Sequence, residues 1–211
     1  PNYEIVFVDD NSKDRSFDIM SGFHAKDPRV KIVRFSRNFG HQAAITAGLD
    51  HASGDAVVMM DADLQDPPEV IARLVERYKE GYDVVYAGER NEKGIGAFKL
   101  WTASVFYRTI NALTDVDIPL DTGDFRLISR KVVDSLKSIN EKNRFLRGLI
   151  TWIGYRQIGV DYVRDPRYAG ETKFTVKKMM RFAIDGISSF SHVPLKIATL
   201  MGFVVSFISF L

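Results

Sequence analysis

The 211-residue chain contains no cysteine. Disulfides, thiolate metal sites and thiol catalysis are therefore excluded, and the composition agrees with a reducing compartment. A large excess of one charge is also missing, and the formal net charge of +2 argues against a dedicated nucleic-acid binder. The chain has no signal-peptide pattern and begins at Pro1 rather than at methionine, so we expect an N-terminal truncation.

Several well-known catalytic motifs are missing as well. Gly94-Ile95-Gly96 lacks the third glycine of a dinucleotide-binding fingerprint and does not follow a strand pattern. The sequence has neither a Walker A motif nor the nucleophile elbow of serine hydrolases, which argues against both enzyme classes. Its histidines show no metal-ligand spacing and are expected to be surface or packing residues (His24, His41, His51 and His192). His41 is retained as a candidate, because it follows Gly40 in an expected ligand loop.

The most informative segment lies at residues 54–68. An apolar run at 56–60 predicts a buried strand, and Asp61, Asp63 and Gln65 follow it directly. Strand alternation places both carboxylates on one side, at the strand end where open α/β sheets bind ligands. Two carboxylates and an amide oxygen suit Mg²⁺ or Mn²⁺, which substrate phosphates help to hold. The structural alternative is a polar turn that caps the next helix, but Asp66 before Pro67 already supplies that cap.

Strand-like and helix-like runs alternate along the first part of the chain. Apolar runs predict strands at residues 5–8, 30–34, 56–60 and 84–87. Helices are expected after Ser12 to about residue 25, at 40–51 and from 67 to about 80. This rhythm predicts an α/β fold with a mostly parallel, doubly wound sheet. Ligand loops should gather at the strand C-termini, at residues 9–12, 36–40 and 61–66.

The second part of the chain completes a catalytic domain that we expect to span residues 1–163. The basic and aromatic segment 90–111 is expected to be helical. A turn at 122–127 leads into a strand, helices follow from about 131 to 153, and another strand is expected at 158–162.

The C-terminal part of the chain predicts contact with a membrane. After a charged loop at 164–175, a helical pattern places apolar residues on one face and Lys177, Arg181, Asp185 and Ser188 on another, as in an interfacial helix. Basic residues outnumber acidic ones throughout 164–192, which predicts a cytoplasmic globular part at the inner (plasma) membrane. Residues 197–211 carry no charge, and we expect 193–211 to begin a transmembrane helix, although a span needs ~20 residues. A terminal core helix is the alternative, but it should carry a polar stripe.

Three motifs resemble the family 2 inverting glycosyltransferases of the GT-A fold. They are Val8-Asp9-Asp10-Asn11-Ser12 with Asp14, Arg37-Asn38-Phe39-Gly40-His41-Gln42 with Ala44 and Gly48, and Asp61-Ala62-Asp63-Leu64-Gln65-Asp66-Pro67-Pro68. Two more resemble the polyprenyl-phosphate sugar transferases, which include dolichyl-phosphate mannose synthase and the bactoprenol glucosyltransferases. These are Thr122-Gly123-Asp124-Phe125-Arg126 and Arg164…Arg167-x-x-Gly170-x-Thr172-Lys173-Phe174. The family's opening strand and Pro-x-x-Asn-Glu loop are absent, and so is the Gln-x-x-Arg-Trp motif of processive synthases.

The resemblance implies roles for individual residues. Asp10 would bind the nucleotide base, with capping of the following helix as its structural alternative. Arg37 would stack on the base or reach a phosphate, unless it is an ordinary surface arginine. The metal, Mg²⁺ or Mn²⁺, would be bound by Asp63 with Asp61 and Gln65, and Asp61 would also contact ribose or a metal-bound water. Arg167 and Lys173 flank a glycine in a loop that could close over the diphosphate.

The acceptor side of the site is predicted in the same way. Asp124 lies where this family places its catalytic carboxylate, and it could remove a proton or position the acceptor. The acceptor phosphate needs cations, for which the candidates are Arg90, Lys99, Arg108 and Arg126, each with a solvated surface charge as its alternative.

These observations lead to one main functional hypothesis and two alternatives. The main one is a membrane-anchored enzyme that transfers one sugar, glucose from UDP-glucose, to polyprenyl (undecaprenyl) phosphate with inversion. The first alternative is the same reaction with GDP-mannose. The second is a non-catalytic scaffold that binds nucleotide sugars. Several transmembrane helices are expected in the full-length protein, and its oligomeric state is left open.

Overall fold

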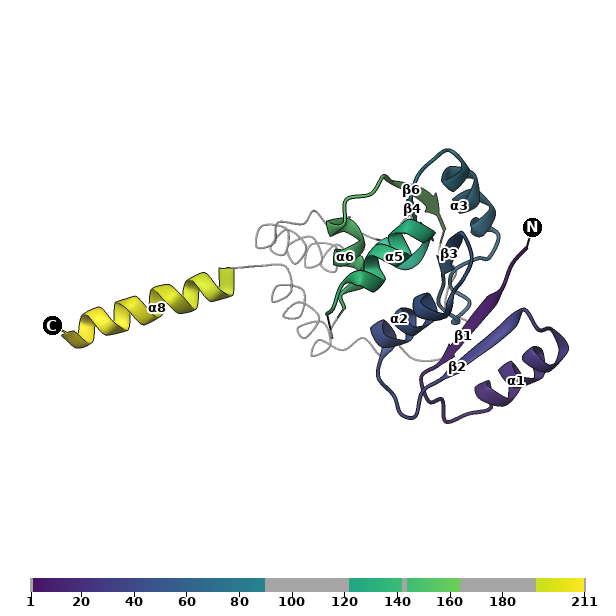
Figure 1. Ribbon diagram of the computed structural model, residues 1–211, viewed down its shortest axis with the longest axis horizontal. Coiled ribbons are helices and arrows are strands. Elements are labelled where there is room, and N and C mark those ends of the chain that lie inside the picture. The colour runs from purple at the N-terminus through teal and green to yellow at the C-terminus, as the bar shows by residue number, and fades with distance from the viewer. Residues whose placement is uncertain (1, 90–121, 142–143, 164–192, 211) are drawn as a thin grey trace.

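The computed structural model describes residues 2–89, 122–141, 144–163 and 193–210 (Figure 1). The expected helix at 90–111, the charged loop and the interfacial helix at 164–192 lie outside these residues. The first half of the chain folds as strands and helices in alternation, as expected for an α/β protein.

The first two strands form a small parallel sheet. β1 (Ile5–Asp9) pairs with β2 (Val30–Arg34) in a register that runs from Ile5↔Val30 to Asp9↔Arg34. α1 (Ser16–Lys26) connects the two strands, and α2 (His41–His51) follows β2. Both strands therefore end beside the loops that lead into the two helices.

A second sheet carries the remaining strands in the order β3-β5-β4-β6. Its members are β3 (Ala56–Met59), β4 (Val84–Glu89), β5 (Thr122–Ser129) and β6 (Gln157–Tyr162). β4 and β6 are parallel, but β5 runs antiparallel to both of its neighbours. The prediction of one mostly parallel sheet is therefore wrong for the described residues. An apolar run predicts a strand but not its direction, which depends on the connection before β5.

Helices cover both faces of the four-stranded sheet. On one face α5 (Arg130–Ser138) and α6 (Leu146–Trp152) pack on Val84 and Ile128, both of which are fully buried. On the other face α3 (Val70–Lys79) packs against Val85 and Leu127. Successive residues of β4 and β5 thus enter opposite layers of the core, because strand side chains alternate between the two faces. This core fixes the ends of the strands from which the candidate site is built.

The last described element is α8 (Val193–Phe210), which extends away from the α/β part of the molecule (Figure 1). Its large apolar side chains are exposed, with Phe203 at 71% and Phe210 at 90%. A helix is found where the apolar run predicted one, but the transmembrane segment itself is not confirmed. Within the part of the chain that the structure describes, no helix has both the length and the apolar character required to cross a membrane.

Candidate active site

Asp10 organises the loop that precedes α2. Its carboxylate accepts hydrogen bonds from the backbone N–H groups of Phe39 (2.6 Å) and Gly40 (2.9 Å). The side chain of Asn38 donates to the backbone carbonyl of Asp10. Gly40 has a φ of 98°, in the left-handed region that favours glycine. Asp10 therefore fixes the start of α2, and its role in binding the base stays a prediction.

Arg37 lies at the surface of the same loop. Its guanidinium group stands 4.0 Å from the centre of the Phe39 ring, and one of its N–H groups donates to the carbonyl of Asn38. Phe39 is itself 49% exposed. Both side chains are accessible to a ligand, and the contact of Arg37 with a nucleotide stays a prediction.

The acidic segment after β3 is a loop rather than a continuation of the strand. β3 ends at Met59, so the prediction that strand alternation aligns Asp61 and Asp63 is wrong. The loop instead bends at Leu64, which has a φ of 60°, and the carboxylate of Asp63 accepts the N–H of Gln65 at 3.2 Å. Asp63 is thereby tied to the backbone of Gln65, and the binding of a metal by these residues stays a prediction.

Asp66 ties this loop to the four-stranded sheet. The hydroxyl of Tyr162, on β6, donates to the carboxylate of Asp66 at 2.5 Å, and both residues are buried. The helix expected from residue 67 begins three residues later, at Val70. The position of Asp61, Asp63 and Gln65 is therefore coupled to β6 through Asp66.

The Tyr162→Phe variant is expected to lose about 1–2 kcal/mol of unfolding free energy, because a buried hydrogen bond to a carboxylate is removed. The edge-to-face contact of residue 162 with Phe125 should remain. Urea unfolding measures the change. Tyr78→Phe is the matched control, since the Tyr78 hydroxyl makes only a 3.5 Å contact with the carbonyl of Asp55. Equal losses in the two variants would contradict a special role for Tyr162.

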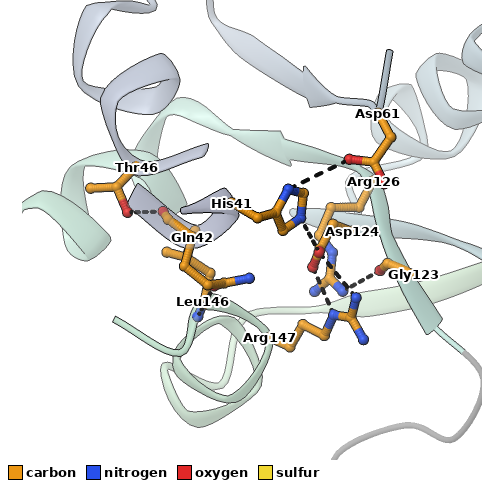
Figure 2. A network of polar contacts seen from close by, with 9 residues as sticks. All are labelled: His41, Gln42, Thr46, Asp61, Gly123, Asp124, Arg126, Leu146 and Arg147. Atoms are coloured by element: carbon orange, nitrogen blue, oxygen red, sulfur yellow. Dashed lines mark hydrogen bonds and ion pairs between the residues drawn. The ribbon is translucent and has the colours of Figure 1, made fainter. Parts of the chain in front are cut away.

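Asp124, on β5, is the centre of a polar network (Figure 2). His41 Nε2, at the start of α2, lies 2.7 Å from Asp124 Oδ2. Arg147, from α6, donates from Nε to Oδ1 (2.7 Å) and from Nη2 to Oδ2 (3.0 Å). The other imidazole nitrogen, Nδ1, is 3.8 Å from the carboxylate of Asp61. His41 thus lies between the acidic loop and Asp124.

The charges in this network determine its protonation. Burial alone would raise the pKa of Asp124, but hydrogen bonds from His41 and Arg147 outweigh it and hold that pKa well below its usual range. The same hydrogen bond to Asp124 raises the pKa of His41. Asp124 is therefore a carboxylate stabilised by Arg147 and His41, which makes it a weak base near neutral pH.

Arg126 contributes a buried positive charge beside this carboxylate. The residue is 4% exposed, and its Nη2 donates to the carbonyl of Gly123 at 2.8 Å. Burial lowers its pKa to about 10. Its Nε is buried without a hydrogen-bond partner, which is costly unless a ligand or water satisfies it. This environment agrees with the predicted binding of an anion, and that role stays a prediction.

A metal ion fits the acidic loop by its chemistry. Among the described residues no group of three or more histidine, cysteine, aspartate or glutamate side chains is placed to hold a metal. Mg²⁺ and Mn²⁺ do not require such a group, because one or two carboxylates together with substrate phosphates are sufficient. Burial raises the pKa of Asp61; His41 lowers it, and the carboxylates of Asp124, Asp66 and Asp63 raise it. A divalent cation would relieve this mutual repulsion, so the donor set of Asp61, Asp63 and Gln65 suits one.

Some of the predicted residues lie close together in the structure, and others lie outside the described residues. Asp61, Asp124 and Arg126 belong to one neighbourhood with His41 (Figure 2). Five predicted residues lie outside the described ranges: Arg90, Lys99, Arg108, Arg167 and Lys173. Arg147 was not predicted. The signal available in the sequence was a lone charge within the apolar helix Leu146–Trp152.

Comparison with known proteins supplies a family context. Residues 1–137 match the sequence profile described as Glycosyl transferase family 2. The "Uncharacterized glycosyltransferase YkcC" of Bacillus subtilis is 57% identical over 210 residues, covering 100% of this chain and 65% of the relative. The "Prophage bactoprenol glucosyl transferase homolog" of Escherichia coli is 44% identical, covering 99% of this chain and 68% of the relative.

Solved structures agree on the fold. A mannosyltransferase from Pyrobaculum calidifontis, in complex with GDP-Man and Mn²⁺, superposes with a TM-score of 0.50 at 20% identity. The match covers 76% of this chain and 46% of that protein. The chain therefore spans only part of the proteins that it resembles.

Proposed function

The chain belongs to glycosyl transferase family 2, and we propose that it is the catalytic part of an enzyme that transfers one sugar to polyprenyl phosphate with inversion. Glucose from UDP-glucose is the proposed donor. The observation that carries the proposal is the buried Asp124 carboxylate, hydrogen-bonded to His41 and Arg147 next to the acidic loop. The Escherichia coli relative, whose name specifies a bactoprenol glucosyl transferase homolog, supports glucose as the sugar and a polyprenyl lipid as the acceptor.

The chemistry of the acceptor explains why Asp124 can remain ionised and paired. A sugar hydroxyl must lose a proton as it attacks, so its enzyme needs a general base. A lipid monophosphate has a second pKa of about 6 and is already largely a dianion at neutral pH. A carboxylate with a depressed pKa is a poor base but a good partner for cations. Asp124 is therefore proposed to position the acceptor together with Arg126, the neighbouring buried cation.

The donor side of the site is assigned to the acidic loop. Asp61, Asp63 and Gln65 would hold Mg²⁺ or Mn²⁺, which neutralises the charge of a diphosphate leaving group. Asp10 and Arg37 are proposed to contact the nucleotide, because both lie in loops at the carboxyl ends of β1 and β2. Arg126 is proposed to bind the acceptor phosphate, together with Arg90, Lys99 and Arg108. Arg167 and Lys173 are proposed to close over the diphosphate.

A polyprenyl acceptor also requires contact with a lipid bilayer. The exposed apolar side chains of α8 and the excess of basic residues at 164–192 support attachment to the cytoplasmic surface of the plasma membrane. Membrane anchoring, like the identity of donor and acceptor, is proposed for the whole enzyme of which this chain is the proposed catalytic part.

Incubation with radiolabelled sugar nucleotides tests the reaction. The purified protein is mixed with polyprenyl phosphate and Mg²⁺, and label is counted after lipid extraction. UDP-glucose should label the lipid fraction only when acceptor and metal are both present, with EDTA and acceptor-free samples as controls. Preferential labelling from GDP-mannose would show that GDP-mannose, and not UDP-glucose, is the donor. Absence of label from every donor would overturn the proposed function.

A further inference from the structure

Arg147 holds the Asp124 carboxylate in one orientation. Two parallel N–H groups reach the two carboxylate oxygens, at 2.7 and 3.0 Å, and His41 adds a third contact at 2.7 Å. Arginine–carboxylate pairs of this bidentate kind restrict rotation as well as attract, because the planar fork matches the planar carboxylate. Figure 2 shows the guanidinium group and the imidazole approaching Asp124 from different elements.

The backbone around Arg147 is itself fixed. The N–H of Leu146 donates to the side-chain carbonyl of Gln42 on α2, at 3.2 Å. The apolar neighbours Leu146, Leu149 and Ile150 are at most 2% exposed. This hydrogen bond attaches α6 to α2 one residue before Arg147, and α2 also carries His41. The two side chains that contact Asp124 therefore come from helices that are hydrogen-bonded to each other.

The burial of Asp124 makes this support necessary. Its side chain is 8% exposed, whereas that of Arg147 is 25% exposed. A buried carboxylate is costly unless it is paired and hydrogen-bonded. Arg126, which is also buried nearby, donates to the carbonyl of Gly123. Arg147 is thus the arginine whose geometry matches the carboxylate directly.

We propose that Arg147 is a positioning residue, which acts by fixing the orientation of Asp124 and has no contact of its own with the sugar nucleotide. This inference rests on the proposed function, because it assumes that Asp124 serves the transfer step. It predicts that α6, which lies outside the acidic loop, controls turnover without controlling donor binding.

The Arg147→Met and Arg147→Lys variants test the proposal. A misplaced catalytic group can cost about 100-fold, so Arg147→Met should lower kcat by about that factor with KM for the donor nearly unchanged. Lysine keeps the charge but cannot form two parallel hydrogen bonds to the carboxylate. The kcat of Arg147→Lys should therefore lie between those of Arg147→Met and the wild type. Arg156→Met is the matched control, because Arg156 is exposed and stacks on Tyr82 at the opposite end of β6. Thermal unfolding confirms that all variants are folded.

A double-mutant cycle separates positioning from direct substrate binding. If Arg147 acts only through Asp124, adding Arg147→Met to Asp124→Asn should reduce kcat no further. Losses that multiply in the double variant would overturn the proposal and assign Arg147 to the substrate. Arg147→Met with the turnover of the wild type would overturn it as well, while leaving the proposed function intact. A wild-type protein without transfer activity would overturn both.

Discussion

The Asp63→Asn variant is expected to lose most of its metal-dependent affinity for UDP and to lower turnover by about 1000-fold, or about 4 kcal/mol in activation free energy. The physical reason is the acidic loop. Asp61 lies close enough to the carboxylates of Asp63, Asp66 and Asp124 for them to raise its pKa, and a divalent cation held by Asp61 and Asp63 would offset this repulsion. An amide cannot supply the negative charge of a carboxylate to the metal, although it has nearly the same shape.

Calorimetric titration of UDP with and without Mn²⁺ measures the effect directly. Asp55→Asn is the matched control, because Asp55 is exposed at the opposite end of β3 and its removal leaves the acidic loop unchanged. The fold should survive the substitution at Asp63, since the carboxylate of Asp63 lies in a loop after the strand. Unchanged Mn²⁺-dependent affinity in Asp63→Asn would exclude Asp63 as a metal ligand.

Much of the chain's local structure could be predicted from its sequence. The strand at 30–34 is found with the predicted bounds, and α2 begins one residue later than expected. These elements are determined by local signals: β-branched apolar runs and a glycine before the helix. The family resemblance, read from three loop motifs, is confirmed by the match over residues 1–137.

Long-range features could not be predicted in the same way. Periodicity gives no direction for β5, which inserts antiparallel between β3 and β4. β3 ends at Met59, so Asp61 and Asp63 depend on a bend at Leu64 rather than on strand alternation. Arg147 pairs with a residue 23 positions away on another element, and no local pattern encodes that pairing. The site was therefore predictable in its residue types but not in its contacts.

Asp124→Asn is expected to reduce turnover by at least about 100-fold while changing donor affinity little, because its proposed work concerns the acceptor and the transition state. The amide keeps the size of the side chain but removes the charge that pairs with His41 and Arg147. Arg147 and His41 would then face a neutral group in a partly buried site. Asp124 would then lack the charge with which it is proposed to organise the acceptor site.

Single-turnover transfer to polyprenyl phosphate, compared with calorimetric binding of UDP and Mn²⁺, separates the two effects. Asp134→Asn is the matched control, since Asp134 is an exposed residue of α5 paired with Arg130 at 3.7 Å. Loss of a buried charge partner can also destabilise the protein by about 3 kcal/mol, so thermal unfolding accompanies the kinetics. Asp124→Glu, which restores the charge at a shifted position, should recover stability more than turnover. Near wild-type transfer by Asp124→Asn would make Asp124 a structural residue, because a group that positions the acceptor cannot be neutralised without cost.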